Sequence, residues 1–313
     1  MPSASGQAWK LTLPCTRDEA EAIDVAAIED DVVLMTSEIV EDDRERWQLD
    51  AYVDREPDPA LIARLRALAP SGGMAPVIER LDNQDWVTLS QAGLHPIREG
   101  RFAVHTAAHP VAPLPGGRAF LIEASRAFGT GHHATTAGCL AMLDAMADQG
   151  FDNVIDVGTG TGLLAFAARH LWPRASVTAT DIDPIAIEVT RENAAINDVA
   201  AIDLIVADGA LHEAIVARAP FDLLIANVLA GPLVSMAPEL AAIAAPGATI
   251  VLAGLLDRQE DGVAAAYRAC GCSVEQADRR GDWTILRLAA GHRRFVPSTP
   301  PDPRGRDGWA LDL

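Results

Sequence analysis

The sequence predicts an α/β protein in two parts: a small α+β domain, then a larger domain built on a parallel sheet. From residue 135 to 290, apolar runs of strand length alternate with helix-length amphipathic segments, which is typical of consecutive β-α-β units. A glycine-rich turn at 156–162 joins one apolar run to the next helix. Before residue 82, short strands and helices follow one another in the order β-α-β-β-α-β. The length of 313 residues fits about two domains.

Residues 1–82 are expected to fold as a ferredoxin-like domain, because this order of elements is that of the split β-α-β fold. The alternation is clearest at 46–54, where Trp47, Leu49 and Val53 share one face of the strand. The predicted elements are a strand at 9–13, a helix at 17–29, strands at 31–37 and 46–54, a helix at 59–68 and a strand at 75–81.

Residues 83–128 are expected to form a linker, because glycine and proline interrupt this stretch repeatedly. Two short segments within it, 101–106 and 119–123, are expected to be strands that lie close to the second domain.

Residues 129–290 are expected to form a doubly wound sheet that closes on an antiparallel strand. The tail at 291–313 is rich in Pro, Arg, Gly and Asp, and we expect it to be disordered. Helices are predicted at 135–148, 162–171, 184–196, 232–244 and 257–270, and strands at 153–157, 176–181, 203–207, 221–226, 248–254, 273–278 and 283–288.

The turn Asp156-Val157-Gly158-Thr159-Gly160-Thr161-Gly162 is the most informative stretch of the chain. Glycines allow a sharp backbone turn and a close approach of a ligand to bare amides, and the helix that follows directs its positive N-terminus there. The dinucleotide fingerprint needs a third glycine where Leu163 stands. A G-x-G-x-G turn after an acid suits S-adenosylmethionine better than NAD. An NAD site and a turn without a ligand are the alternatives.

Two carboxylates are expected to complete this cofactor site. Asp181 ends the next apolar run, and a carboxylate at the end of a second strand can hold the two ribose hydroxyls of an adenosine. Asp156 can face the ammonium of the amino-acid tail, directly or through water. The amides of Gly158 and Gly160 would border the ligand.

The stretch 127–136 also leads through glycines into a helix, and it supplies hydroxyls at Thr130 and Thr136. For Thr135 and Thr136, which stand at the start of that helix, the alternative is helix capping alone. His132 and His133 are adjacent, so their side chains diverge, and no acid stands at metal-ligand spacing. We therefore predict no metal site.

Asn227 ends the apolar run 221–226, at the sheet edge where α/β proteins bind their ligands. Its amide offers both a hydrogen-bond donor and an acceptor to a cofactor or to a substrate amine. We expect it to be the catalytic residue; the alternative is an ordinary residue at the end of a strand.

The formal net charge is −19, and the first 90 residues carry 19 of the 44 acidic side chains but 8 of the 25 basic ones. Such a surface repels nucleic acid and would attract a basic partner; the alternative is that the acidic surface only keeps the protein in solution. The longest apolar region, 231–256, contains Glu239 and three prolines, so no membrane span is expected. The N-terminus lacks the apolar block of a secretory signal, and the four cysteines form no C-x-x-C pair, which favours a cytoplasmic protein. The sequence has no heptad repeat or exposed apolar stripe that would indicate assembly, so we expect a monomer.

Four motifs resemble the ribosomal protein L11 methyltransferase family of bacteria: A-F-G-T-G-x-H-x-T-T at 127–136, D-x-G-x-G-x-G at 156–162, D-I-D-P at 181–184 and A-N-x-L-A-G-P-L at 226–233. The resemblance extends to about residue 290. It implies a ferredoxin-like domain for substrate recognition, followed by a Rossmann-like, seven-stranded class I methyltransferase domain. It also implies cofactor contacts at Thr136, Gly158, Asp181 and Asn227.

The same resemblance implies an enzyme that transfers methyl groups from S-adenosylmethionine to amino groups of ribosomal protein L11, on lysine side chains, the N-terminal amine or both. The partner would be this basic protein of the large ribosomal subunit. The chain departs from the family after Trp86, where the aromatic, lysine-rich run of many members is missing, and after Gly291, where the tail has no counterpart.

Other functions are compatible with parts of the pattern. Methyltransferases of glutamine or adenine carry Asn-Pro-Pro-aromatic at the end of this strand, whereas Val228-Leu229-Ala230 follow Asn227 here. A methyltransferase of another protein or of a small amine, and a non-catalytic module that only binds, are the remaining alternatives.

Overall fold

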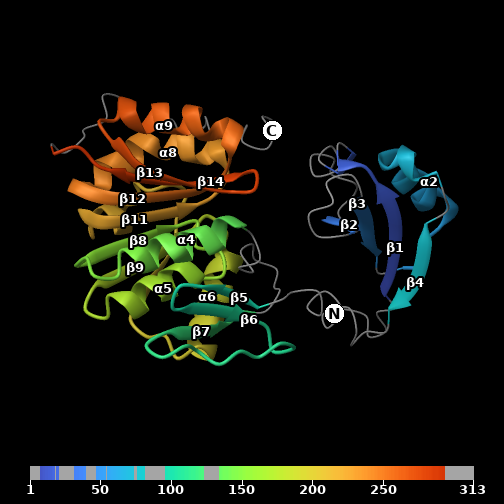
Figure 1. The fold of residues 1–313 in the computed structure, drawn as a ribbon, viewed down its shortest axis with the longest axis horizontal. Helices are drawn as coiled ribbons and strands as arrows, with labels where there is room; N and C mark the ends of the chain where they lie inside the picture. The colour runs from blue at the N-terminus through green and yellow to red at the C-terminus, as the bar shows by residue number, and fades with distance from the viewer. Residues whose placement is uncertain are drawn as a thin grey trace. The chain divides into compact units, whose positions relative to one another are not determined.

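The computed structural model describes residues 8–17, 19–20, 32–39, 47–53, 55–73, 76–81, 96–122 and 134–292. The chain separates into two compact units, residues 1–90 and 91–312 (Figure 1). Each unit has its own sheet and its own apolar core. No helix of the described ranges is long and apolar enough to cross a membrane.

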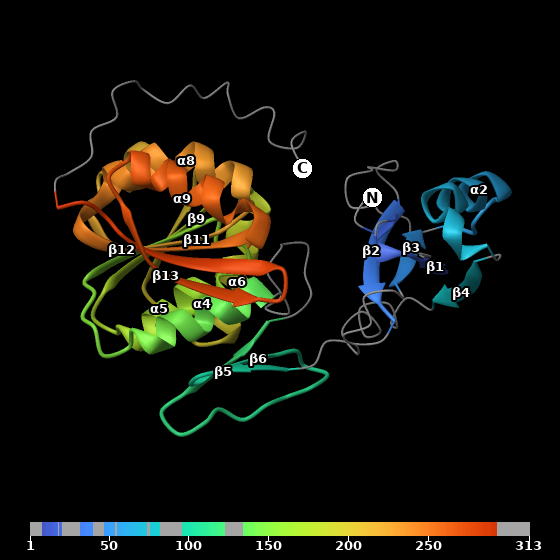
Figure 2. The same cartoon turned by 45° about the horizontal axis from the view of Figure 1, so that its top comes forward.

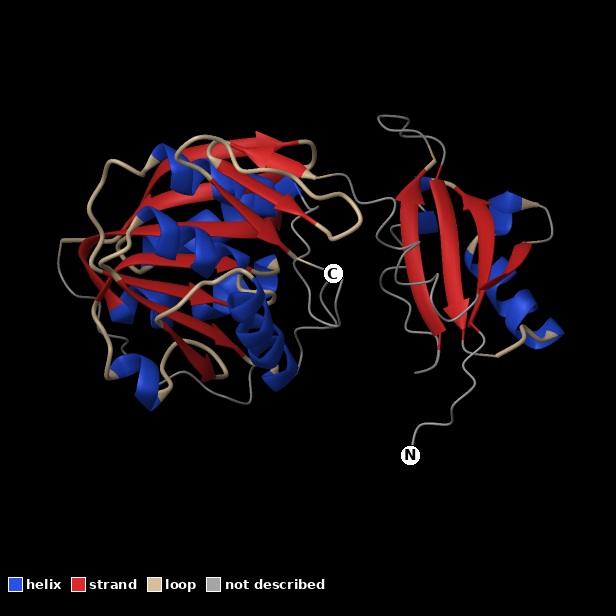
Figure 3. Ribbon diagram, turned by 90° about the horizontal axis from the view of Figure 1, so that it is seen from below, coloured by secondary structure: helices blue, strands red, loops and turns tan. Residues whose placement is uncertain are grey.

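The first unit contains a four-stranded antiparallel sheet (Figure 3). The order of its strands is β2-β3-β1-β4, which is the order of a ferredoxin-like domain. Inward side chains such as Leu11 and Leu49 pack on Leu61 and Leu65 of the helix α2. The predicted helix at 17–29 falls largely outside the described residues. The elements are β1 (Ala8–Cys15), β2 (Val32–Glu38), β3 (Trp47–Val53), α2 (Pro59–Leu68), a 3₁₀ turn (Pro70–Gly72) and β4 (Val77–Leu81).

Local chemistry explains where α2 begins. Asp58 accepts a hydrogen bond from the backbone N–H of Leu61 at 2.7 Å, which caps the helix, and Pro59 stands at its first position. The observed helix, Pro59–Leu68, has the bounds that the sequence predicts.

The second unit contains a seven-stranded sheet in the order β10-β9-β8-β11-β12-β14-β13. The strands from β8 to β12 are parallel, and β14 pairs antiparallel with both of its neighbours. This is the predicted Rossmann-like sheet that closes on an antiparallel strand. The strands are β8 (Asn153–Val157), β9 (Ser176–Asp181), β10 (Ile202–Val206), β11 (Phe221–Asn227), β12 (Ala244–Leu256), β13 (Ser273–Arg280) and β14 (Trp283–Ala289).

Helices cover both faces of this sheet, as Figure 2 shows, with α8 and α9 on one side and α4 and α5 on the other. Alternate residues of each central strand enter the two cores; in β11, for example, Leu224 joins the core on the side of α8 and Leu223 joins the core on the side of α4 and α5. Strands buried on both faces read as continuous apolar runs, which is the pattern in the sequence. The helices are α4 (Ala134–Ala145), α5 (Leu163–Leu171), α6 (Pro184–Ile196), α7 (Glu213–Val216), α8 (Ala230–Ile243) and α9 (Glu260–Ala269), with a 3₁₀ turn at Asp257–Gln259.

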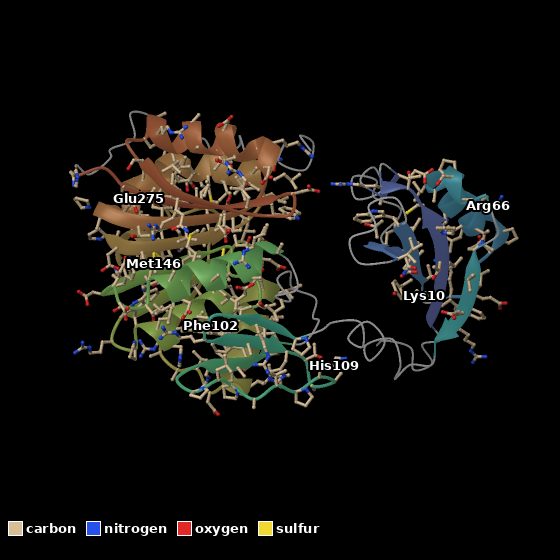
Figure 4. All side chains as sticks on the ribbon, in the orientation of Figure 1. Lys10, Arg66, Phe102, His109, Met146 and Glu275 are labelled. Carbon is tan, nitrogen blue, oxygen red and sulfur yellow. The ribbon has the colours of Figure 1, made fainter. Side chains whose placement is uncertain are left out.

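Residues 96–122 lie within the segment predicted as a linker, and in the structure they are part of the second unit. They form a three-stranded sheet in which Phe102 (Figure 4) and Phe120 are buried in the core beneath α5. Asn197, just after α6, holds this sheet through its side chain, which accepts from the N–H of Leu121 at 2.7 Å and donates to its carbonyl at 2.9 Å. The strands are β5 (Ile97–Glu99), β6 (Phe102–His105) and β7 (Arg118–Leu121).

Candidate active site

One edge of the second sheet, where parallel strands end, carries three of the predicted site residues: Gly158, Asp181 and Asn227. β8 ends at Val157 just before the glycine turn, β9 ends at Asp181 and β11 ends at Asn227. From β8 the strand order runs to β9 and β10 on one side and to β11 and β12 on the other. The edge between β8 and β11 is therefore a topological switch point, where open α/β sheets form their ligand crevice.

The glycine turn has a backbone that only glycine adopts easily. Gly158, Gly160 and Gly162 have φ angles of +73°, +56° and +89°. The N–H groups of Gly158 and Thr159 both donate to the carbonyl of Thr180, at 2.8 and 2.9 Å, which ties the turn to β9. The helix α5 starts at the residue after Gly162 and places its N-terminus against the turn.

A side chain at Gly158 would also meet a neighbour: a Cβ built there overlaps Cγ1 of Val228, the residue that follows Asn227. At Gly158, the backbone of the glycine turn therefore lies directly against the residue that follows β11. From the opposite direction, α6 holds the turn, because Thr190 Oγ1 donates to the carbonyl of Gly160 and Asn193 Nδ2 donates to that of Thr161.

Asp181 is half-buried, and backbone N–H groups orient its carboxylate. Gly160 donates to Oδ2 at 2.9 Å, and Asp183 donates to Oδ1 at 3.0 Å. Each carboxylate oxygen has further lone pairs, so the group can still accept bonds from two hydroxyls. The two acids of the D-I-D-P motif thus differ in role: Asp183 caps α6 by accepting from Ile185, and Pro184 begins that helix.

Asp156 is buried, with 1% of its surface exposed. Its Oδ2 accepts from Thr159 Oγ1 at 2.6 Å and from the N–H of Ala165 at 3.2 Å. No donor among the described residues reaches Oδ1. Burial raises the pKa of this carboxyl to about 7; the bonds from Thr159 and Ala165 act in the opposite direction, and the charge of Asp181 adds to the rise. A cation at Oδ1 would stabilise the ionised form.

Asn227 and Thr136 meet across the same edge. Asn227 Nδ2 donates to Thr136 Oγ1 at 3.2 Å, and Thr136 lies buried in the first turn of α4. This bond uses one N–H of the Asn227 amide and fixes the orientation of the side chain, which leaves its carbonyl oxygen to accept from a donor. Thr130 and the His132-His133 pair lie outside the described residues, so the role of Thr130 stays a prediction.

Sequence reasoning missed two residues of this edge, Val228 and Gly254. Val228 donates its N–H to the carbonyl of Ala253 at 3.1 Å, which extends the pairing of β11 with β12 beyond Asn227. Gly254 has φ +87° and packs on the same Val228 peptide. An isolated glycine within a strand pattern is a signal for a bulge or for a close approach of another backbone, and that signal is present here.

The residues of this edge fit an adenosine that carries an amino-acid tail and a positive charge. Asp181 presents an oriented carboxylate for vicinal hydroxyls, and the turn at Gly158 and Gly160 exposes backbone without side chains next to it. Buried Asp156 has one carboxylate oxygen without a hydrogen bond from the described part of the chain, which suits an ammonium group.

Comparisons with known proteins agree on one family. The family model described as ribosomal protein L11 methyltransferase (PrmA) matches residues 11–290. The protein named ribosomal protein L11 methyltransferase from Agrobacterium fabrum is 41% identical over 264 residues, which cover 83% of this chain and 90% of that protein. Its namesake from Brucella abortus is 40% identical over 264 residues, which cover 84% and 91%.

Among solved structures, a ribosomal protein L11 methylase from Lactobacillus delbrueckii subsp. bulgaricus superposes with a TM-score of 0.57 at 27% identity. The match covers 64% of this chain and the whole of that one. Since the family model and the curated relatives span both units, the predicted resemblance is confirmed. This chain belongs to the ribosomal protein L11 methyltransferase family.

Proposed function

We propose that the protein transfers methyl groups from S-adenosylmethionine to amino groups of ribosomal protein L11, on lysine side chains, the N-terminal amine or both. Family membership supports the methyltransferase activity, and the names of the relatives support the substrate. The observation that carries the proposal is the meeting of the glycine turn, Asp181 and Asn227 at one sheet edge.

In addition to the cofactor contacts that the family motifs imply at Thr136 and Asn227, four residues around the glycine turn would hold the cofactor. Asp181 would accept bonds from the two ribose hydroxyls, Asp156 would face the ammonium of the amino-acid tail, and the backbone at Gly158 and Gly160 would border that tail. When bound, S-adenosylmethionine supplies a methyl group on a sulfonium that is already an activated leaving group. The chain itself must therefore align an amine and keep it unprotonated.

The second requirement is the harder one for a lysine. With an ordinary pKa of about 10.4, a lysine is neutral in fewer than about one molecule in a thousand at pH 7, whereas an α-amino group with a pKa near 8 is neutral in about one in ten. A low-dielectric pocket next to a positive charge lowers the pKa of either amine. The amine can lose its proton to water before it docks, and the pocket then favours the neutral form. The site therefore needs no dedicated general base.

Asn227 would orient the amine. The bond from its amide nitrogen to Thr136 at 3.2 Å fixes the side chain, and its carbonyl oxygen accepts a hydrogen bond from the neutral amine and directs the lone pair toward the methyl group. Thr136 fixes the side-chain amide and therefore acts through Asn227, in addition to the cofactor contact that the family motif implies.

The first unit would recognise the protein substrate. The first 90 residues hold 19 acidic side chains against 8 basic ones, and such a surface attracts a basic protein of the large ribosomal subunit. The same charge disfavours direct binding to nucleic acid.

Transfer of a radiolabelled methyl group from S-adenosylmethionine to purified ribosomal protein L11 tests the proposal. The wild-type chain is expected to label the protein, and acid hydrolysis is expected to yield methylated lysine, methylated N-terminal residue or both. The Gly158→Arg variant is expected to be inactive, because its side chain would overlap Val228 and strain a turn that has φ +73° at this position. Labelling of another protein or of a small amine instead, or no labelling, would contradict the proposal.

A further inference from the structure

We propose that Gly254 is a positioning residue for methyl transfer: its missing side chain lets the Val228 peptide lie against β12, and this contact sets the position of Asn227. This inference rests on the proposed function of Asn227. It assigns a role to a residue outside the motifs that carry the family resemblance.

The contact occurs at an irregularity of β12. Leu252 pairs with Leu286 and Leu255 pairs with Thr284, so Ala253 and Gly254 together stand opposite Ile285. This two-against-one arrangement is a β-bulge, and Gly254 adopts φ +87° within it. The bulge turns the backbone of β12 toward the loop that follows β11.

The space at Gly254 is closed to any side chain. A Cβ built there lies 2.7 Å from the carbonyl carbon of Val228, 3.0 Å from its nitrogen and closer still to its oxygen. These are backbone atoms, which cannot rotate away as the end of a side chain can. Any other residue at 254 must therefore push the Val228 peptide out of place.

Val228 is confined on its other side by the cofactor turn. Its Cγ1 occupies the space that a Cβ at Gly158 would fill, and its N–H donates to the carbonyl of Ala253. One residue after Asn227, the chain is thus wedged between two glycines of different elements. Because a peptide is planar, a shift of Val228 moves the backbone of Asn227 with it.

The chain offers matched controls for the backbone conformation. Gly247, in the same strand, has φ +77°, and Gly271 has φ +85°. A Cβ built at either one meets nothing within 4 Å among the described residues. Alanine at 247 or 271 thus imposes the same kind of backbone strain as alanine at 254, without the overlap with Val228.

The test compares the Gly254→Ala, Gly247→Ala and Gly271→Ala variants of the full chain. For Gly254→Ala we expect kcat at saturating substrates to fall by about 10- to 100-fold, the scale of an ångström-sized misplacement. Its calorimetric Kd for S-adenosylhomocysteine should stay within about threefold of wild type, because Asp181 and Gly160 are unchanged. The two control variants should keep both values.

A readout independent of turnover accompanies these measurements. The side-chain amide resonances of Asn227, assigned by their loss in Asn227→Asp, should shift in Gly254→Ala and remain in place in the two control variants. If Gly254→Ala fails to fold, Val228→Ala takes its place, since it removes the isopropyl group seated over Gly158. It should lower kcat and shift the same resonances.

Each outcome decides the inference. Unchanged kcat and unchanged Asn227 resonances in Gly254→Ala, or in Val228→Ala if that variant replaces it, would overturn it, as would a loss of cofactor affinity equal to the loss in kcat. With an active wild-type chain, these results leave the proposed function intact. A wild-type chain that transfers no methyl group would overturn both.

Discussion

At the scale of single residues, Asn227 is the side chain that we propose to orient the substrate amine. Replacing it by alanine removes the acceptor for the substrate amine and the donor to Thr136, but it leaves the strand and the glycine turn unchanged. We expect kcat to fall by about 100-fold, the scale of losing an orienting group. The melting temperature should change little because Asn227 is half-buried at the end of β11.

Steady-state kinetics of Asn227→Ala, with a thermal melt of the same preparation, check this prediction. Turnover equal to that of wild type in a folded variant would remove Asn227 from the mechanism. The Asn227→Asp variant serves as the comparison, because it keeps an acceptor oxygen but adds a charge next to Thr136.

Asp156 predicts a pH dependence of cofactor binding. Burial raises the pKa of its carboxyl to about 7, so the protonated form dominates below that pH. A cationic tail favours the ionised form, and binding at lower pH must therefore release a proton. We expect the affinity for S-adenosylhomocysteine to rise from pH 6 to pH 7.5, by up to about tenfold per pH unit below pH 7.

Calorimetry across this pH range, in buffers with different ionisation enthalpies, measures both the affinity and the proton release. The Asp156→Asn variant should bind more weakly and with a flatter pH profile. An affinity that falls as the pH rises, or that is equally steep in the variant, would show that Asp156 does not meet the ammonium.

At the scale of elements, a buried carboxylate ties the loop after β10 to α8. Glu239 is 1% exposed and accepts from the N–H of Ala210 at 2.8 Å. Glu239→Ala leaves that buried donor unsatisfied and opens a cavity, so we expect the free energy of unfolding to fall by about 1–3 kcal/mol. Glu239→Gln retains an acceptor oxygen and should lose less.

Urea unfolding of the two variants checks this, with Glu188→Ala as the control for an exposed glutamate in a helix. Equal stability of Glu239→Ala and Glu188→Ala would contradict the structural role of the buried carboxylate.

Elements were predictable where short-range signals agree. The helix α6 is predicted to the residue, because Asp183 and Pro184 mark its start and its apolar face has the helical period. The four-residue helix α7 was missed, since one turn is shorter than any periodic window. β12 begins four residues before its predicted start, because its pairing with β11 extends to Ala244 near the start of that strand.

The candidate site, too, could be predicted from the sequence only in part. Motifs in the sequence predict that Asp156, Gly158, Asp181 and Asn227 belong to the site, because each stands at or next to the end of a recognisable strand. The contacts of Val228 with Gly158 and Gly254 depend on the order and register of β8, β11 and β12, which no local pattern specifies. For the same reason, the sequence does not show that Asn227 bonds to Thr136, 91 residues earlier in the chain.

At the scale of the whole molecule, the two units differ in their balance of charge. The net charge is −19, and the acidic excess is greatest in the first 90 residues. If this surface steers a basic protein substrate, added salt must weaken the encounter, since the Debye length falls from about 10 Å at 0.1 M to about 3 Å at 1 M. We expect kcat/KM for the protein substrate to fall by about tenfold or more between 50 and 500 mM salt.

The Kd for S-adenosylhomocysteine, measured at the same salt concentrations, is the internal control and should change much less, because Asp156 and Asp181 are at least partly shielded from solvent. A kcat/KM for the protein substrate that is insensitive to salt would contradict electrostatic steering and would leave shape complementarity as the basis of recognition.

The most direct test of the account is a calorimetric titration of the purified, folded chain with S-adenosylhomocysteine, with Asp181→Ala titrated alongside. The account predicts saturable binding of one molecule per chain, weakened at least about tenfold in the variant, because the carboxylate that accepts the ribose hydroxyls is lost. Absence of binding to the folded wild-type chain, or equal affinity in the variant, would contradict it.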